Sequence, residues 1–300
     1  MVHIIDLEFL GLKNSIASFL IEADSGPVLI ETGPASTLPA LWAGIRKAGY
    51  QPEDVKEVFI THIHLDHAGA AWWFAQNDAK IYLHPLGVSH LADPSRLLNS
   101  ARRIYKDDMA RLWGDFLPIE SDRLVAVEDD EDIDLQNLKI KAHHTPGHAV
   151  HHIAWQIDRT LFTGDVAGVK INNGPVQAPC PPPDINLADW KDSILKIKSL
   201  NLNKFYLTHF GMVENIDDHL EQLNEAMENW AGWVKKNGKN ETSIEMLTED
   251  FKSYVRSQLI DSGVEEEEGL NQYEAANPGW MSVAGLLRYW KKKDEVKTNN

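Results

Sequence analysis

Four side chains that can bind a metal ion lie within six residues, at His62, His64, Asp66 and His67. They follow a short apolar run at residues 58–60, which is typical of a β-strand. If the chain stays extended, His62, His64 and Asp66 point to one side, because side chains alternate along a strand. A helix beginning near residue 70 would then bend the chain where Asp66 and His67 can hold a second ion. The spacing therefore predicts one loop that serves two metal ions.

Three further candidates follow predicted strands. His148 comes after the Pro146-Gly147 turn, Asp165 follows Gly164, and His209 ends the apolar run at residues 204–207. Because each candidate follows a short β run, we expect the site to be assembled at one edge of a sheet. A single histidine usually satisfies only a local hydrogen bond, and we interpret the remaining histidines near the site in that way: His84, His143, His144, His151 and His152.

The H-x-H-x-D-H stretch resembles the signature of the metallo-β-lactamase superfamily, and the resemblance covers roughly residues 15–215. It implies an α/β fold, the αβ/βα four-layer sandwich of that family, with a C-terminal helical extension. It also implies a ligand set for two metals. The first ion is expected on His62, His64 and His148, and the second on Asp66, His67 and His209, with Asp165 bridging both.

Two divalent metal ions are therefore the expected cofactors, Zn²⁺ by default with Fe or Mn as alternatives. Such a pair, about 3.5–4 Å apart, holds a bridging hydroxide and polarises a substrate oxygen. The resemblance implies a hydrolase that cleaves an ester-type bond of a small-molecule substrate, a thioester or a lactone. Asp66 and Asp165 are also expected to accept the proton of the nucleophile. An iron-dependent, dioxygenase-like oxidoreductase on the same fold is the alternative, and a metal-stabilised binding protein is a third.

Departures from the family pattern narrow these possibilities. Glu31 stands where members usually carry an aspartate that supports the metal site, so we expect an acid there with a longer side chain. Gly168 stands where quorum-quenching lactonases have a tyrosine. His64 stands where the diiron reductases have a glutamate, and the second metal site is complete, whereas persulfide dioxygenases need only one iron.

Composition sets the class of protein. The chain has 300 residues, 43% of them hydrophobic and 25% charged, which is typical of a soluble globular protein. A formal net charge of −16 argues against nucleic acid or an anionic membrane as partner. We expect a cytoplasmic protein, because the first residues lack the basic character of a signal peptide and the single Cys180 can form no internal disulfide. The oligomeric state is left open.

Alternating strand and helix patterns predict a catalytic domain at residues 1–215 and an α-helical extension at residues 216–300. Strands are predicted at 17–22, 28–31, 56–61, 80–83, 124–127, 138–142, 152–156, 160–163 and 204–207. Helices are predicted at 36–49, 70–76, 190–200, 217–236, 244–260 and 283–292. The acidic run at residues 128–132 is interpreted as a solvated turn.

A helical insertion at residues 86–118 interrupts this rhythm and is rich in basic residues, namely Arg96, Arg102, Arg103, Lys106 and Arg111. Together with residues 280–290 it is expected to form the substrate-binding walls. The arginines are interpreted either as a lid that binds an anionic substrate or as a solvated helix face. The proline-rich run around Cys180 is a further candidate for the wall of the pocket.

Overall fold

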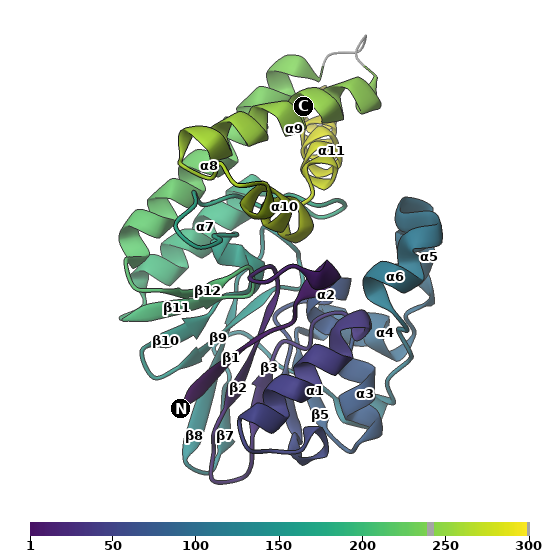
Figure 1. The fold of residues 1–300 in the computed structure, drawn as a ribbon, viewed down its shortest axis with the longest axis vertical. Coiled ribbons are helices and arrows are strands. Elements are labelled where there is room, and N and C mark those ends of the chain that lie inside the picture. The colour runs from purple at the N-terminus through teal and green to yellow at the C-terminus, as the bar shows by residue number, and fades with distance from the viewer. Residues whose placement is uncertain (239–242, 299–300) are drawn as a thin grey trace.

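The computed structural model describes residues 1–238 and 243–298. Within this part, two six-stranded mixed sheets lie face to face, with helices on both outer sides (Figure 1). Across the first sheet lie, in order, β1 (Val2–Asp6), β2 (Ala17–Ile21), β3 (Val28–Ile30), β4 (Glu57–Phe59), β5 (Lys80–Leu83) and β6 (Leu124–Ala126). Across the second lie β12 (Gly211–Val213), β11 (Lys204–Leu207), β10 (Thr160–Phe162), β9 (Ile153–Ile157), β8 (Leu138–His144) and β7 (Asp132–Leu135).

Alternation along the strands divides the apolar side chains between layers. Phe19 and Phe59 face the second sheet, whereas Leu20 and Val58, their neighbours in sequence, face the helices of the first half. The ring of Phe59 meets Trp155 of the second sheet edge-on, with ring centroids 5.0 Å apart. A core between the sheets and a core outside each sheet make the four layers of the αβ/βα sandwich that the sequence predicts.

Helices cover the outer face of each sheet. On the first sheet lie α1 (Leu38–Lys47) and α3 (Ala71–Gln76), and their apolar side chains Leu41 and Phe74 enter its outer core. On the second lie α7 (Leu187–Ser199) and α8 (Ile216–Asn237), which bury Trp190 and Met227. Because α8 belongs to the predicted extension, the extension and the second sheet share one core. The predicted boundary between a catalytic domain and a helical extension at residue 215 stays a proposal.

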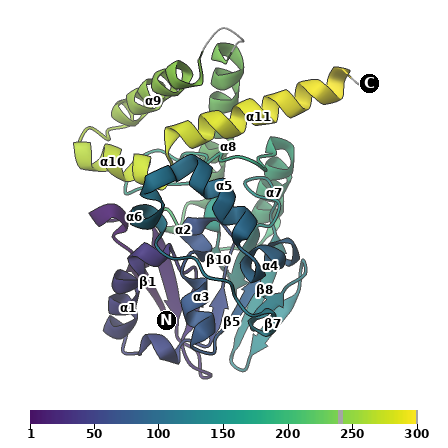
Figure 2. The same cartoon turned by 90° about the vertical axis from the view of Figure 1, so that its right-hand side faces the viewer.

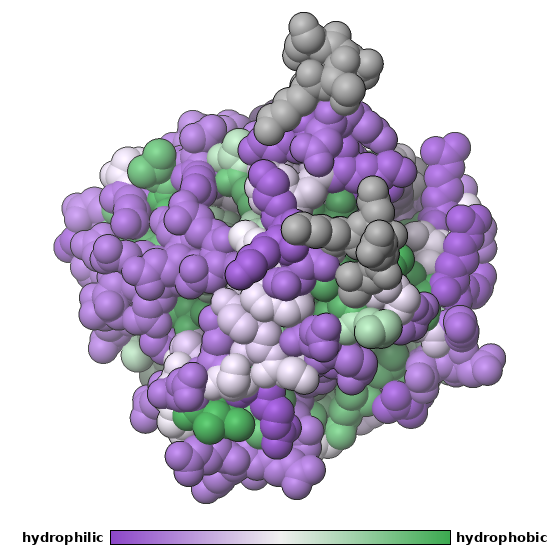
Figure 3. Space-filling model, turned by 90° about the horizontal axis from the view of Figure 1, so that it is seen from above, coloured by the Kyte–Doolittle hydropathy of each residue, from purple (hydrophilic) through white to green (hydrophobic). Residues whose placement is uncertain are grey.

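Two helical groups lie on the same side of the sandwich, above the sheet edges in both ribbon views (Figures 1 and 2). The insertion forms α4 (Pro85–Ala92), α5 (Ser95–Tyr105) and α6 (Met109–Trp113). The C-terminal part forms α9 (Ile244–Asp261), α10 (Glu267–Ala276) and α11 (Gly279–Thr298). The face seen from above is mostly hydrophilic, with apolar residues recessed between polar ones (Figure 3). Among the described helices, none is long and apolar enough to cross a membrane.

Some elements differ from the prediction. The insertion is broken after Tyr105, where Lys106 has a φ of 48°, so α5 and α6 are separate helices. The strands β1, β7 and β12 and the helix α10 were not predicted. Strand β7 carries acids at alternate positions, and Asp132 pairs with Lys139 of β8 at 2.8 Å. Charged side chains are common on an edge strand because they remain exposed to water. The acidic residue at the start of β7 was therefore interpreted from the sequence as the end of a solvated turn.

The C-terminal helices hold the loop that follows Asp165. The backbone N–H of Cys180 donates to Ser282 Oγ at 3.2 Å, and the Asn277 side-chain amide donates to Gln177 Oε1 at 3.1 Å. A Cβ atom on Gly285 of α11 would lie 2.0 Å from the carbonyl oxygen of Cys180. The loop and α11 are therefore in backbone-to-backbone contact, which only glycine at position 285 allows.

We expect Gly285→Ala to lower the free energy of unfolding by about 1–3 kcal/mol, because the added methyl group forces α11 away from the loop. Gly232→Ala is the matched control, since a Cβ at Gly232 in helix α8 meets nothing within 4 Å. The control should gain about 0.5–1 kcal/mol from helix propensity. Urea unfolding of both variants measures the difference. Equal stabilisation of the two would contradict the close contact.

Candidate metal centre

Residues from both sheets meet at one edge of the sandwich. The backbone N–H of Ile153 donates to the carbonyl of Thr61 at 2.7 Å, and the N–H of Ala17 donates to the carbonyl of Thr208 at 2.8 Å. These bonds join the end of β4 to β9 and the end of β11 to β2. The loops after β4, β8, β10 and β11 therefore converge, and they carry all the predicted ligands: His62, His64, Asp66, His67, His148, Asp165 and His209.

The loop after β4 is not extended throughout, so one expectation from the sequence is wrong. His64 is the last extended residue, with φ −62° and ψ 153°, and it precedes the helical turn α2 (Leu65–Ala68). Strand alternation therefore does not set the direction of Asp66. The helical turn instead brings Asp66 and His67 together, with His67 Nε2 3.6 Å from Asp66 Oδ2.

Three imidazoles form the first ligand group. His64 Nδ1 lies 2.8 Å from His62 Nε2 and 3.1 Å from His148 Nε2. Burial, followed by the neighbouring histidines, holds the pKa of His62 and of His64 well below its usual value. Neutral imidazoles present lone pairs, and three converging lone pairs are the donor set that Zn²⁺ takes in sites with an open position.

Asp66, His67 and His209 form the second group, and Asp165 lies between the two. His209 Nε2 lies 3.5 Å from Asp66 Oδ2. Asp165 Oδ1 lies 3.3 Å from His67 Nε2 and 3.4 Å from His209 Nε2, whereas its Oδ2 lies 3.3 Å from His148 Nε2. One carboxylate therefore presents one oxygen to each group.

Several of these atoms have no hydrogen-bond partner although they are buried. They are His67 Nε2, His209 Nε2 and Asp165 Oδ1. Buried polar atoms in folded proteins are nearly always hydrogen-bonded, so a convergent set of donor atoms without other partners fits a bound cation. The ligand atoms within each group lie within 4.8 Å of one another. Nitrogen and carboxylate donors at this spacing fit Zn²⁺, and also Fe and Mn.

The opposite ring nitrogens of the histidines are held by the protein. His148 Nδ1 donates to the carbonyl of Pro179 at 2.9 Å, and His209 Nδ1 donates to the carbonyl of Ser15 at 2.7 Å. Because a carbonyl only accepts, each Nδ1 carries the proton and each Nε2 is left as a donor to a metal. The proline-rich run therefore takes part in the site through its backbone, while the Cys180 side chain is buried in the core.

Glu31 supports the second group from behind. It is completely buried, and its Oε1 accepts from the Thr61 hydroxyl and lies 3.1 Å from His67 Nδ1. Although burial lowers the pKa of His67, the carboxylates of Asp165, Asp66 and Glu31 together raise it above its usual value. The longer side chain that departs from the family pattern thus still reaches the ring of a predicted ligand.

Sequence reasoning missed one positioning residue, His152. The backbone N–H of Asp165 donates to its Nε2 at 3.2 Å, while its Nδ1 donates to Thr145 Oγ1 at 2.8 Å. The expectation that the remaining histidines only satisfy hydrogen bonds of their surroundings holds for His84 and His144. His84 caps α4, and His144 forms a hydrogen bond with the Val127 carbonyl. His152 directly follows His151, and nothing in the spacing of this pair marks one of them as a residue that positions a ligand.

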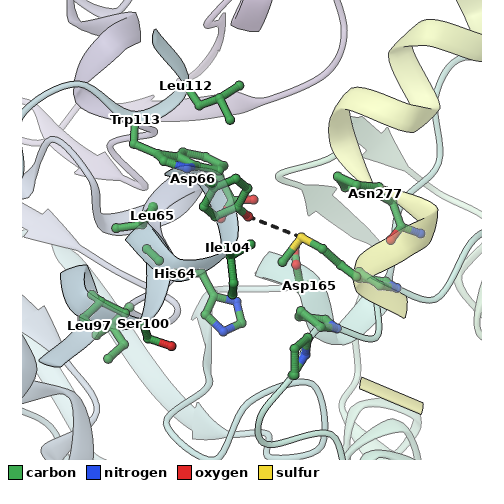
Figure 4. A pocket seen from close by; sticks show the side chains of 18 of the residues that line it. His64, Leu65, Asp66, Leu97, Ser100, Ile104, Leu112, Trp113, Asp165 and Asn277 are labelled. Carbon is green, nitrogen blue, oxygen red and sulfur yellow. Dashed lines mark hydrogen bonds between the residues drawn. The ribbon is translucent and has the colours of Figure 1, made fainter. Parts of the chain in front are cut away.

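A cavity of about 840 Å³ opens from the metal centre between the insertion and the C-terminal helices. Figure 4 shows His64, Asp66 and Asp165 between Leu97 on one side and Asn277 on the other, with Ile104 beside His64. The walls also include Tyr105, Trp113, Trp280 and the prolines at 179 and 181–183, so the insertion, the start of the 280–290 segment and the proline-rich run all line the cavity.

The arginine-rich lid is not confirmed. Arg102 and Arg103 are exposed and do not line the cavity. Arg111 does line it, but its Nε donates to Asp108 at 3.0 Å. Arg288 donates to the carbonyl of Pro183 on the C-terminal side. Of the two interpretations, the solvated helix face therefore describes Arg102 and Arg103.

We expect Gly164→Ala to reduce metal content, because Gly164 has a φ of 50° and a Cβ there would lie 2.4 Å from Thr61 Oγ1 and 2.8 Å from His152 Nε2. Gly211→Ala is the control, since Gly211 also has positive φ but would meet nothing within 4 Å. The control should lose about 1–2 kcal/mol of stability and keep its metal. Elemental analysis after loading with Zn²⁺ and desalting measures both. Full metal content in Gly164→Ala would contradict the close packing of this turn.

Comparisons with known proteins agree with the geometry. The model of the Metallo-beta-lactamase superfamily matches residues 13–209. The metallo-beta-lactamase fold-containing protein ST1585 of Sulfurisphaera tokodaii is 29% identical over 172 residues, covering 55% of this chain and 65% of that protein. An atrochrysone carboxyl ACP thioesterase of Aspergillus fumigatus is 26% identical over 170 residues, covering 56% of this chain and 42% of that protein. The match thus spans less than two thirds of either relative.

Solved structures share the fold over almost the whole chain. The metallo-beta-lactamase family protein TTHA1429 from Thermus thermophilus has a TM-score of 0.70 at 17% identity, covering 98% of this chain and 94% of that one. The structure of ST1585 has a TM-score of 0.61 at 21% identity, covering 90% and 98%. From the family match and the shared fold, the chain belongs to the metallo-β-lactamase superfamily.

Proposed function

We propose that the protein is a dinuclear metal-dependent hydrolase that cleaves an ester-type bond, with a thioester ahead of a lactone. The observation that carries the proposal is the position of Asp165, whose two oxygens face two separate groups of ligand atoms. A carboxylate in this position is suited to bridging two cations. The thioesterase among the relatives supports a thioester, and Gly168 lacks the phenol expected of the lactonases.

In this proposal His62, His64 and His148 hold one ion, Asp66, His67 and His209 hold the other, and Asp165 contacts both. A pair of divalent ions, when bound, lowers the pKa of a water molecule towards about 7 and polarises the oxygen of the scissile group. Zn²⁺ is the expected metal, and the same donors accept Fe or Mn.

The chain itself supplies a proton acceptor at the cavity floor. Asp66 is partly exposed and lines the cavity, whereas the other members of its group are buried. Burial raises the pKa of Asp66, but His67 and His209 outweigh burial and lower it to about 2, so the carboxylate is ionised at neutral pH. Because it is ionised and faces the cavity, we propose Asp66 as the first candidate to accept the proton of an attacking water, with Asp165 as the second.

The iron-dependent oxidoreductase remains the alternative, and metal identity separates the two. A hydrolase should act with Zn²⁺, which has no redox chemistry, whereas an oxidoreductase needs iron and an oxidant. A panel of ester, thioester, lactone and phosphodiester substrates, assayed with the Zn²⁺-loaded protein, tests the proposal. Turnover that requires iron and consumes oxygen would replace hydrolysis with the alternative.

We expect two metal ions per chain, and we expect Asp165→Ala to lower occupancy at both positions because its carboxylate is the side chain shared between them. Elemental analysis of the purified and the Zn²⁺-loaded protein gives the ratio. Chelation should also lower the melting temperature, since a ligand that binds only the folded state stabilises it. A ratio near one in a fully active enzyme would rule out the dinuclear centre.

The two ion positions should respond to different substitutions. We expect His209→Ala to empty mainly the second position and His148→Ala mainly the first, with hydrolysis falling by at least about a hundredfold in both. His219→Ala is the control, because His219 is also buried but its Nε2 lies 2.7 Å from the Ala167 carbonyl, away from the ligand groups. Metal content and turnover together decide the assignment. Normal values for both in His209→Ala would remove His209 from the ligand set.

A further inference from the structure

We propose that the substrate carries a long or bulky uncharged apolar acyl group, and that this group lies in the cavity between α5–α6 and α10–α11. The inference deepens the proposed function and rests on it for the reaction at the metal centre. The substrate class, however, comes from the cavity walls rather than from the metal ligands.

The size and chemistry of the cavity exceed what a short acyl group needs. Its volume of about 840 Å³ lies at the upper end of the range of roughly 300–1,000 Å³ found for small-molecule sites. Many of the side chains that line it are apolar, among them Leu65, Leu97, Ile104, Leu112, Trp113 and Trp280. An acetyl or lactoyl group would leave most of this apolar surface in contact with water, whereas a long acyl group would cover it.

Apolar residues also gather at the mouth of the cavity. Leu86 is 57% exposed, Leu10 44%, Val150 43% and Ile104 38%, and all four line this one cavity. They come from separate segments, so no single helix face accounts for them. Single exposed aliphatic residues are normal on a protein surface, but convergence at the mouth of a deep apolar cavity indicates a binding surface.

The charges in the cavity offer no net attraction to an anionic group. Beyond the metal centre the lining carries the acids Asp108, Asp184 and Glu274 and the bases Arg96 and Arg111. Arg111 is bound to Asp108, and Glu274 is paired with Lys252 at 3.4 Å, which leaves Arg96 and Asp184. A second carboxylate or a phosphate on the acyl group would therefore find no excess of positive charge on these walls. The walls fit a neutral hydrocarbon or aromatic group.

Aromatic rings join the two walls near the metal centre. Tyr105 of α5 lies edge-on to Trp113 of α6 and to Trp280 of α11, with ring centroids 5.1 and 5.8 Å apart. The Tyr105 hydroxyl donates to Met281 Sδ at 3.4 Å, the contact drawn as a dashed line in Figure 4. A thioether is a weak acceptor on a flexible side chain, so this contact can yield to a substrate. The walls are therefore suited to bulky groups of different shape.

The test uses thioesters of one neutral thiol with acetyl, octanoyl and dodecanoyl groups, below their micelle concentrations, and the full-length metal-loaded protein. We expect kcat/KM to rise at least about tenfold from acetyl to dodecanoyl, because each buried methylene adds to binding. Ile104→Ser and Trp280→Ala should remove most of that rise, so that the ratio of the dodecanoyl to the acetyl value falls towards one. Leu195→Ser is the control, since Leu195 is 63% exposed on α7 and does not line the cavity.

Binding is measured separately with the S-ethyl and S-dodecyl thioethers of the same thiol, which cannot be hydrolysed. The inference is supported if wild type and Leu195→Ser bind the dodecyl compound more tightly than the ethyl compound and Trp280→Ala does not. This holds even if no thioester is turned over, because a lack of turnover would count against the proposed function alone. Hydrolysis that does not depend on chain length, together with equal binding of the two thioethers, would overturn the inference and leave the hydrolase intact.

Discussion

The structure depends on one electrostatic constraint, a buried carboxylate placed among imidazoles. Asp165 is almost fully buried, and it faces His67, His148 and His209. Burial raises the pKa of Asp165, but His67, His148 and His209 outweigh it and hold the pKa well below the usual value, so the group is charged. A buried charge is costly unless it is paired. Cations held by the lone pairs of the surrounding imidazole nitrogens would pair with this carboxylate. The fold supports this arrangement from several directions.

That support connects distant parts of the chain. Glu31 at the end of β3 reaches His67, Ser15 before β2 fixes His209, and the Pro179 carbonyl fixes His148. The loop that contains Pro179 is held in turn by α11 through Ser282. The C-terminal helices therefore do more than line a cavity. They fix the loop whose carbonyl sets the tautomer of a predicted ligand, so the cavity walls and the candidate metal centre share one framework.

Much of the fold, and the convergence of the candidate ligands at one sheet edge, could be predicted from the sequence because the signals are local. Short β runs precede His62, Asp165 and His209, and strand ends at one edge of a sheet bring such residues together. The direction of Asp66 could not be predicted, because α2 has only four residues and no periodicity to detect. The role of His152 depends on hydrogen bonds to Thr145 and Asp165, and the exposure of Arg102 depends on which face of α5 packs against the protein. Spacing alone does not contain that information.

X-ray absorption spectroscopy of the protein loaded with Zn²⁺ tests the central claim most directly, because it reports the distance between two ions rather than their number alone. Ligand groups that share Asp165 predict a metal–metal scattering feature at about 3.5–4 Å, together with nitrogen and oxygen neighbours. At full loading, a spectrum with only light-atom neighbours and no metal–metal feature in that range would contradict a centre bridged by Asp165.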